Sequence, residues 1–379
     1  MILWPVKALI TQNIKFATMV IERTTKEKLN AVWNKRPIII SGPCSAESET
    51  QVIETAKQLA ATGKVDVLRA GIWKPRTRPG GFEGIGAKGL PWLQKAEQET
   101  GLLTACEVAT AKQVQDALTF DVDILWIGAR TTVNPFSMQE VADALRGVDV
   151  PVLIKNPVNP DIELWGGAVE RIARSGIKQI GLIHRGFSSY GNTQYRNAPM
   201  WHLAIDMKLR YPGMPMITDP SHICGNRHDI QEMCQRAIDV DFDGLIVESH
   251  IDPDNAWSDA KQQITPERLG EILNTLIWRK EDSTNVEFQK AIEKLRQQIN
   301  NLDDELLQIL GQRMKIADQI GQYKKDNNIT ILQPGRWHEI VEMTVAKGER
   351  MGLSRDFINK YLDALHIESI NHQKKIMDA

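Results

Sequence analysis

The sequence has few of the residues that mark disulfide-bonded or zinc-ribbon proteins. Its 379 residues include four cysteines, none of them in a Cys-x-x-Cys pair: Cys44, Cys106, Cys224 and Cys234. Such scattered cysteines argue against both a disulfide scaffold and a zinc ribbon. A reducing cytoplasm is therefore the expected location.

The sequence also lacks an excess of either charge and a long apolar run. Lysine and arginine number 46, and aspartate and glutamate 48, which gives a net charge of −2. Because no overall basic field attracts nucleic acid, any anion must bind at a local site. The mildly apolar first 20 residues are interrupted by Lys7, Gln12, Asn13 and Lys15. We therefore expect neither a signal peptide nor contact with a membrane.

What the sequence does contain is a repeated alternation of apolar runs and helical segments. Hydrophobic residues make up 42% and charged residues 25%, as in globular proteins, and the length suits two or three domains. Eight short apolar runs occupy residues 38–40, 65–68, 102–106, 124–127, 150–154, 180–183, 214–217 and 245–247. Runs that are nearly continuous are typical of parallel strands covered on both faces.

This alternation predicts a TIM-type (β/α)8 barrel over residues 37–280, after an N-terminal extension over residues 1–36. An open, doubly wound α/β sheet is the alternative, which is weakened because no glycine-rich dinucleotide fingerprint follows an early run. Helix starts are indicated by capping-box spacing or by a capping threonine before proline: Ser48 with Gln51, Ser137 with Glu140, and Thr265 with Pro266.

Cationic residues follow several of the runs, where the C-terminal mouth of a barrel would lie. The stretch from Arg69 to Gly81 alone contains four cations, two prolines and paired glycines. The cations expected at one rim are Arg69, Lys74, Arg76, Arg130, Lys155 and Arg185. Because like charges repel, this rim predicts a bound phosphate or carboxylate. The alternatives are a solvated basic loop and pairing of each cation with a local acid.

The same rim contains residues that could bind a metal ion. A thiol, an imidazole and two carboxyl groups follow the first, seventh and eighth runs: Cys44, His222, Glu248 and Asp259. This mixed donor set suits one divalent transition ion, such as manganese, iron, cobalt or zinc, better than calcium or magnesium. Any one of these residues alone would indicate no more than packing or a helix cap.

These motifs resemble those of 3-deoxy-D-arabino-heptulosonate 7-phosphate (DAHP) synthase, in its type I, short-barrel beta subfamily. The match extends approximately from Arg36 to Lys280. It rests on Gly42-Pro-Cys44-Ser-Ala-Glu47, Lys74-Pro-Arg-Thr77, Ile127-Gly-Ala-Arg130, His184-Arg-Gly186, Asp219-Pro-Ser-His222 and Val247-Glu-Ser-His250. The resemblance implies a metal-dependent condensation of phosphoenolpyruvate with erythrose 4-phosphate.

The resemblance also implies roles for individual residues. Metal ligation falls on Cys44, His222, Glu248 and Asp259. Phosphoenolpyruvate would contact Arg69, Lys74, Gly128, Ala129, Arg130, Lys155 and Arg185, with Glu107 nearby as a catalytic residue. Erythrose 4-phosphate would lie against Lys74, Pro75, Arg76 and Thr77. A general-acid role for Lys74 is a further hypothesis.

The rival interpretation of the barrel is 3-deoxy-D-manno-octulosonate 8-phosphate synthase, which uses phosphoenolpyruvate on the same fold. That enzyme has a Lys-Ala-Asn-Arg-Ser motif where this chain has Lys74-Pro-Arg-Thr77. The second loop therefore favours the four-carbon sugar phosphate.

A second, helical region follows a polar linker over residues 281–285. Thr284 and Glu287 have capping-box spacing before a helix of about forty residues, and two more helices are predicted near 334–350 and 354–377. The apolar residues at three-four spacing predict a buried seam: Ile292, Leu295, Ile299, Leu302, Leu306, Ile309, Ile316 and Ile320. Arg313 interrupts this seam, which implies an anionic ligand or a carboxylate partner.

Residues 286–379 resemble the all-helical chorismate mutase family, whose three-helix chains form intertwined dimers. The match rests on Leu295-Arg296, Leu302-Asp303, Gln312-Arg313, Gly321-x-x-Lys324, Arg336 and Ser369-x-x-x-Gln373. It implies one pocket lined by Arg313, Lys324, Arg336, Ser369 and Gln373. Arg296 would reach into it from the other subunit, so we expect a homodimer or a higher homo-oligomer.

The helical region departs from that family at two positions. Gln333 and Trp337 stand where acidic residues are usual, which leaves the strength of chorismate binding open. The alternative is a dimerisation and effector-binding module with little mutase activity. The fusion also suggests that prephenate or chorismate bound by the helices restrains the barrel.

Overall fold

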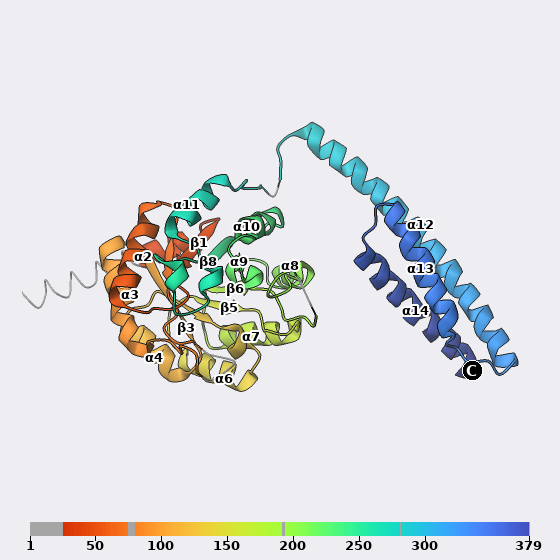
Figure 1. Ribbon diagram of the computed structural model, residues 1–379, viewed down its shortest axis with the longest axis horizontal. Helices are drawn as coiled ribbons and strands as arrows, with labels where there is room; N and C mark the ends of the chain where they lie inside the picture. Colours follow the sequence, from red (N-terminus) through yellow and green to blue (C-terminus); the bar gives the residue numbers. More distant parts are fainter. Residues whose placement is uncertain (1–25, 75–79, 192–193, 281, 379) are drawn as a thin grey trace, which may run out of the picture. The chain divides into compact units, whose positions relative to one another are not determined.

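The computed structural model describes residues 26–74, 80–191, 194–280 and 282–378, apart from the side chains of residues 334 and 336. The chain divides into two compact units between residues 281 and 282 (Figure 1). Among the described residues, no helix is both long and apolar enough to cross a membrane.

The first unit is a closed barrel of eight parallel strands in the order of the sequence. The strands are β1 (Ile38–Gly42), β2 (Val67–Arg69), β3 (Leu103–Val108), β4 (Ile124–Ile127), β5 (Val152–Lys155), β6 (Ile180–His184), β7 (Met216–Thr218) and β8 (Gly244–Glu248). The ring closes where β1 pairs with β8, with Ile40 opposite Ile246. The predicted (β/α)8 barrel is therefore confirmed, and the open doubly wound sheet was wrong.

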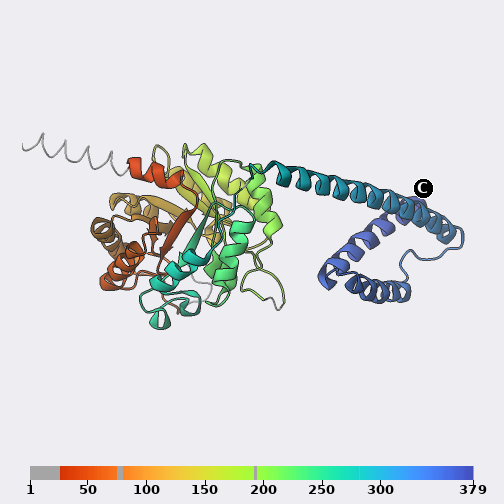
Figure 2. The ribbon, with the colours of Figure 1, turned by 90° about the horizontal axis from the view of Figure 1, so that it is seen from above.

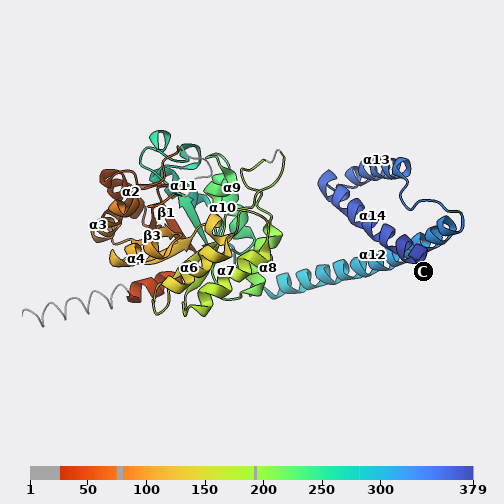
Figure 3. The same cartoon turned by 90° about the horizontal axis from the view of Figure 1, so that it is seen from below.

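Helices surround the barrel on its outside (Figures 1 and 3). They are α2 (Glu49–Ala61), α3 (Leu90–Thr100), α4 (Ala111–Thr119), α6 (Pro135–Ala144), α7 (Ile162–Arg174), α8 (Trp201–Arg210), α10 (Ile230–Asp239) and α11 (Pro266–Thr275), whereas the short helices α5 (Ala129–Thr132) and α9 (Pro220–Cys224) directly follow the ends of β4 and β7. Ser48 and Thr265 cap α2 and α11 as predicted. The predicted start at Ser137 is wrong, because Asn134 caps α6 and Pro135 already occupies its first turn.

The strands bury side chains on both faces, which explains why their sequences are almost continuously apolar. One cluster, which includes Ile39 and Leu125, packs against the surrounding helices. A second cluster inside the barrel includes Ile40, Ile124 and Ile246. Trp33, from the helix over residues 26–33, packs against this inner cluster at the end of the barrel where the strands begin.

The alternation of side chains along each strand determines which polar residues face the barrel interior. Val67 and Leu153 belong to the inner cluster, so the residues two positions later, Arg69 and Lys155, point inward as well. Both are almost fully buried, with exposed fractions of 1% and 4%. By the same rule Glu248 follows Ile246 into the interior, where it is fully buried. The C-terminal end of the barrel interior is therefore a layer of buried charges.

The second unit contains three helices: α12 (Val286–Asp326), α13 (Pro334–Arg350) and α14 (Arg355–Asp378). The three predicted helices are confirmed, but Asn285 caps α12 in place of Thr284. The later half of α12 packs on α14, where a Cβ on Gly321 would lie 3.0 Å from the Gln373 Cα. The earlier half of α12 extends beyond α13 and α14 (Figure 2).

The predicted apolar seam of α12 is not buried within one chain. Its buried residues are Met314, Ala317 and Gly321. Leu302 and Ile309 of the predicted seam are 63% and 60% exposed. Within one chain α13 and α14 cover only part of the long helix, so the buried seam stays a prediction and would require a second chain.

Candidate active sites in the barrel and the helical unit

The four predicted metal ligands approach one another in pairs at the C-terminal end of the barrel. The Cys44 thiol donates to Asp259 Oδ2 at 3.5 Å, and His222 Nε2 lies 3.8 Å from Glu248 Oε1. Around an ion with bonds of about 2.0–2.3 Å, tetrahedral donors lie roughly 3.3–3.8 Å apart. Among the described residues, no three His, Cys, Asp or Glu side chains form a closed metal cluster as they stand.

Electrostatics at these four positions follow from burial and from neighbouring cations. Burial, together with the charge of Glu248, raises the pKa of the Cys44 thiol to about 12. Burial alone would raise the pKa of Glu248, but His222 and Arg69 lower it to about 2. The pKa of Asp259 is likewise held below its usual range by Arg196 despite burial. The carboxylates are therefore ionised, whereas the thiol carries its proton.

Polar side chains that sequence reasoning missed orient the predicted ligands. Gln262 Nε2 donates to Glu248 Oε2 at 2.7 Å. Arg196 Nη1 donates to Asp259 Oδ1 at 3.0 Å and to Gln262 Oε1 at 2.7 Å. These contacts join the segment before α8 to the segment after β8. No motif marks Arg196 or Gln262, so only the fold shows that they meet.

Asp219 is a further carboxylate that the sequence placed in a motif without a role. Its side chain caps α9 by accepting from the His222 backbone N–H at 3.1 Å. Its Oδ2 lies 2.8 Å from His222 Nδ1 and also accepts from Lys155 Nζ at 2.8 Å. A carboxylate behind one ring nitrogen leaves the other nitrogen of His222 directed toward Glu248, as in metal-binding histidines.

The predicted cations occupy different environments. Arg69 Nη1 donates to Glu248 Oε1 at 3.1 Å, and Lys155 pairs with Asp219. For these two cations the structure shows the alternative, pairing with an acid, and anion binding at the rim stays a prediction. Arg185 Nη1 instead donates to Asn197 Oδ1 at 2.8 Å, and burial lowers the pKa of Arg185 to about 10. Arg130 lies on α5 with an exposed side chain.

Lys74 lies directly against the predicted metal ligands. Its Nζ donates to both the carbonyl oxygen and the Sγ of Cys44, each at 3.0 Å. Burial lowers the pKa of Lys74, but the charge that Cys44 carries when ionised and the charge of Glu248 raise it on balance. Pro75, Arg76 and Thr77 lie outside the described residues.

Glu107 and Gly128 meet at the ends of β3 and β4. Glu107 Oε2 accepts from the indole N–H of Trp126 at 3.1 Å. A Cβ on Gly128 would lie 2.1 Å from Glu107 Oε1, so a larger residue there would displace the Glu107 carboxylate. Ala129 follows at the start of α5, with an exposed fraction of 9%. These residues form one wall of the predicted phosphoenolpyruvate site.

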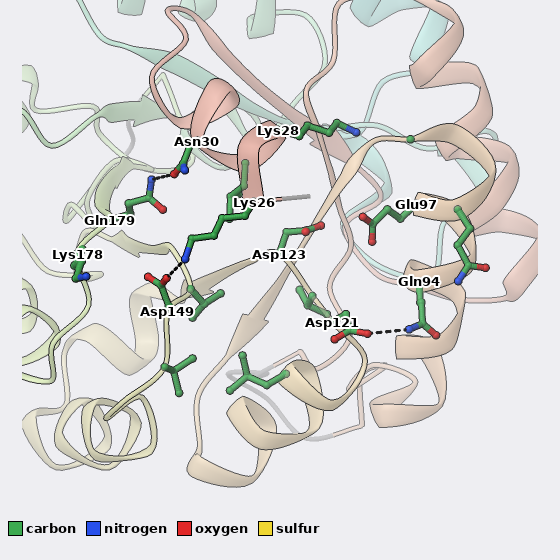
Figure 4. A pocket seen from close by; sticks show the side chains of 17 residues that line it. Lys26, Lys28, Asn30, Gln94, Glu97, Asp121, Asp123, Asp149, Lys178 and Gln179 are labelled. Atoms are coloured by element: carbon green, nitrogen blue, oxygen red, sulfur yellow. Dashed lines mark hydrogen bonds and ion pairs between the residues drawn. The ribbon is translucent and has the colours of Figure 1, made fainter. Parts of the chain in front are cut away.

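A pocket of about 950 Å³ lies at the opposite end of the barrel (Figure 4). The helix over residues 26–33 and the segments that precede β3 to β6 line it, and they contribute Lys28, Glu97 and Asp123. Burial, with a smaller effect of Asp123, raises the pKa of Glu97 to about 7. None of the predicted site residues lines this pocket, so it is distinct from the candidate active site.

The helical unit brings together three of its six predicted site residues: Arg313, Ser369 and Gln373. Arg313 Nη1 donates to Ser369 Oγ at 2.5 Å, and Gln373 Nε2 donates to the Ser369 carbonyl at 3.3 Å. The buried Gln373 Oε1 has no hydrogen-bond partner in the part of the chain that the structure describes. Lys324 Nζ donates to the Ile331 carbonyl at 2.5 Å, and burial lowers the pKa of Lys324.

Arg296 is not part of this cluster. It is exposed on the earlier half of α12. The side chain of Arg336 lies outside the described part. Trp337 stacks on His366 with ring centroids 3.9 Å apart, and Gln333 precedes α13. Arg313, Ser369 and the amide of Gln373 thus meet between α12 and α14, where a carboxylate could bind. Lys324 lies about three turns further along α12.

A barrel whose mouth combines buried cations with thiol, imidazole and carboxylate donors defines an enzyme that acts on small phosphorylated anions. The particular family follows from comparison with known proteins. The chain belongs to the DAHP synthetase I family, whose model matches residues 20–286, and it carries a chorismate mutase type II domain over residues 295–374. It is a bifunctional shikimate-pathway enzyme with a DAHP synthase (transferase) domain and a chorismate mutase (isomerase) domain.

Individual relatives agree with this assignment. Phospho-2-dehydro-3-deoxyheptonate aldolase of Thermotoga maritima is 34% identical over 238 residues, which cover 63% of this chain and 68% of the relative. A crystal structure of that DAHP synthase superposes with a TM-score of 0.57 at 32% identity, covering 64% and 68% of the two chains. A 2-dehydro-3-deoxyphosphooctonate aldolase of Vesicomyosocius okutanii is 27% identical over 63% of this chain and 88% of its own.

Proposed function

We propose that the barrel mouth binds phosphoenolpyruvate through Arg69, Lys155, Arg185 and Arg130, and joins it to erythrose 4-phosphate. The observation that carries this proposal is that Arg69 and Lys155 are buried within one layer with Glu248, next to Cys44 and His222. Buried cations bind a phosphate or carboxylate strongly, because little water competes for them.

The donor set formed by Cys44, His222, Glu248 and Asp259 suits a divalent transition ion. The pairwise spacing of the donors and the carboxylate behind His222 support this assignment. When bound, such an ion supplies Lewis acidity toward the aldehyde oxygen. Metal analysis of the purified protein distinguishes between manganese, iron, cobalt and zinc.

The residues of the chain then position the reactants and move one proton. The cations hold phosphoenolpyruvate so that its C3 attacks the aldehyde carbon, which forms the new carbon–carbon bond. Lys74 Nζ donates a proton to the aldehyde oxygen as that bond forms, since it remains protonated beside Cys44. Water adds at C2, and inorganic phosphate leaves from the same carbon. Glu107 lies on the wall beside Gly128, where a carboxylate could orient that water.

Substrate choice provides the direct test of the barrel. The purified protein is offered erythrose 4-phosphate and arabinose 5-phosphate separately, each with phosphoenolpyruvate, and phosphate release is measured with and without a chelator. We expect faster turnover of the four-carbon sugar and loss of turnover with the chelator. Faster turnover of the pentose would overturn the assignment in favour of the octulosonate enzyme.

In the helical unit, we propose that Arg313, Lys324, Arg336, Ser369 and Gln373 bind chorismate and stabilise its rearrangement to prephenate. Arg313 and Lys324 would hold the carboxylates. The first N–H of the Gln373 amide donates to the Ser369 carbonyl, and its second N–H would face the ether oxygen. Such catalysis is electrostatic, because fixed donors stabilise the charge that develops as the ether bond breaks. A parent protein without mutase activity would leave only a binding role for this unit.

We also propose that the helical unit is completed by a second copy of the chain. The exposed seam of Leu295, Ile299, Leu302, Leu306 and Ile309 is a long apolar face on a helix that its own chain leaves uncovered. Such a face requires a partner, and Arg296 lies on the same half of α12. Leu302→Glu together with Ile309→Glu should convert the dimer to a monomer in sedimentation. An unchanged mass would contradict this proposal.

Feedback through the helical unit is the last part of the proposed function. Prephenate or chorismate bound by the helices would restrain the synthase reaction, and a ligand can do so only if it binds two states of the protein unequally. Synthase kinetics of the full chain are measured with and without prephenate. Rates that do not change over a saturating range would contradict this regulation.

A further inference from the structure

Trp126 lies inside the barrel, directly beneath the buried charges. It is the third residue of β4, is fully buried and belongs to the inner cluster. The other strand residues of that cluster, as far as the structure describes them, are aliphatic. Trp126 is thus a large aromatic ring among small and branched side chains, and its contacts show more than a packing role.

The ring of Trp126 contacts two cations of the proposed phosphoenolpyruvate site. The guanidinium carbon of Arg69 lies 4.8 Å from the ring centroid, and Lys155 Nζ lies 6.0 Å from it. Cations within about 6 Å of an aromatic face are attracted by its negative quadrupole, and the attraction is greatest for tryptophan. Each cation also has an acidic partner, Glu248 for Arg69 and Asp219 for Lys155. The ring gives both cations a common surface that fixes their positions.

The edge of the same ring contacts a third predicted site residue. The indole N–H donates to Glu107 Oε2, and Trp126 pairs with Glu107 in the register of β3 and β4. Glu107 would otherwise be an acceptor for the nearby cations, since its charge acts on Lys74 and Arg185. The hydrogen bond fixes the direction of one oxygen of this carboxylate.

We propose that Trp126 is a positioning residue that presents Arg69 and Lys155 to an anionic substrate and fixes the direction of the Glu107 carboxylate. This inference rests on the proposed synthase function of the barrel. An aliphatic residue cannot replace the ring, because it offers neither a negative face to the cations nor a donor to the carboxylate. Phenylalanine keeps the face and loses the donor.

The two roles are separated by comparing Trp126→Leu with Trp126→Phe in the full-length enzyme. For Trp126→Leu we expect the KM for phosphoenolpyruvate to rise about tenfold or more, since two cation–π contacts are lost, while the KM for the sugar phosphate stays unchanged. For Trp126→Phe we expect that KM to stay within about threefold and kcat to fall, because Glu107 loses its donor.

Trp165 provides a matched control. It is also fully buried, and its indole N–H donates to the Ile154 carbonyl at 3.2 Å, but it packs in the outer cluster against the helices. Trp165→Leu should lower the melting temperature and leave the KM for phosphoenolpyruvate unchanged. Mutase activity of each variant shows that the rest of the chain is folded.

The outcomes distinguish this inference from the proposed function. A Trp126→Leu enzyme that keeps the parent KM for phosphoenolpyruvate, in a parent that turns the substrate over, overturns the assignment of Trp126 alone. A parent that does not bind phosphoenolpyruvate overturns both proposals. Should Trp126→Leu not fold, Trp126→Phe decides, since an unchanged kcat would contradict the positioning of Glu107.

Discussion

Arg69 and Glu248 form an ion pair 3.1 Å long inside the barrel, and neither side chain reaches solvent. Arg69 belongs to the proposed phosphoenolpyruvate site and Glu248 to the proposed metal ligands. The carboxylate that would bind the ion thus neutralises a cation that would bind the substrate. Occupancy of one site therefore changes the charge available to the other.

This ion pair predicts that the metal ion and phosphoenolpyruvate bind cooperatively. An ion on Glu248 weakens its attraction for Arg69, which is then available to the substrate. We expect the metal to tighten phosphoenolpyruvate binding by about tenfold, and phosphoenolpyruvate to tighten metal binding by the same factor, because coupling free energies are reciprocal. Calorimetric titrations of each ligand with and without the other measure both factors. If the affinity for each ligand is the same with and without the other ligand, the two sites are independent.

Removing the amide of Gln262 should weaken metal binding. Gln262 holds Glu248 and is itself held by Arg196, which also pairs with Asp259. Loss of such a supporting contact typically reduces metal affinity by about 10–100-fold, and we expect Gln262→Ala to do so, as measured by competition with a chelating dye. Gln139→Ala, on the exposed side of α6, is the control and should match the parent. A Gln262→Ala protein with parental affinity would remove this residue from the metal site.

Mixing two inactive variants should restore part of the mutase activity. If Arg296 serves the pocket of the other subunit, a dimer of one Arg296→Ala chain and one Arg313→Ala chain contains one intact pocket and one that lacks both residues. Random reassociation of equal amounts should therefore give about a quarter of the parental activity. Synthase activity should stay at the parental level throughout. Failure to recover activity after exchange would place Arg296 outside the partner's pocket.

The buried carboxyl of Glu97 predicts a pH dependence of stability. Its pKa rises from 4.5 to about 7 in the folded protein, mainly through burial and secondarily through Asp123. The folded state thus binds this proton more tightly than the unfolded state does. Protonated Glu97 therefore contributes to the free energy of unfolding below the unfolded pKa, and this contribution is lost as pH rises through 7.

Glu97→Gln removes that loss, so the variant should match the parent near pH 5 and melt at a higher temperature near pH 8. Thermal unfolding at both values tests this. Glu99→Gln, on the exposed part of the same helix, is the control. If Glu97→Gln and the parent have the same melting temperature at both pH values, ionisation of Glu97 does not destabilise the folded protein.

The barrel could be predicted from the sequence because its strands are buried on both faces and therefore form continuous apolar runs, such as 124–127 in β4. The cations at the strand ends were found by the same rule. The partners of those cations were not predictable, since Asp219 and Lys155 are 64 residues apart and meet only when the barrel closes.

The helical unit shows a different limit of prediction from the sequence. The three-four spacing of Leu302 and Ile309 predicts that a face is covered, but it does not say whether the cover comes from the same chain. In the structure both side chains remain more than half exposed, so the described part of the same chain does not cover this face. Trp126 was missed because its sequence context is that of any buried strand residue.

The buried layer of charges at the end of the barrel has a consequence for handling the enzyme. Arg69, Lys155 and Glu248 were removed from water during folding, and the buried Nε of Arg69 has no hydrogen-bond partner in the described part of the chain. Ligands that bind only the folded state shift the unfolding equilibrium toward it. The ligand-free enzyme is therefore the form most prone to inactivation during purification and storage, and inorganic phosphate in the buffer should prolong its shelf life.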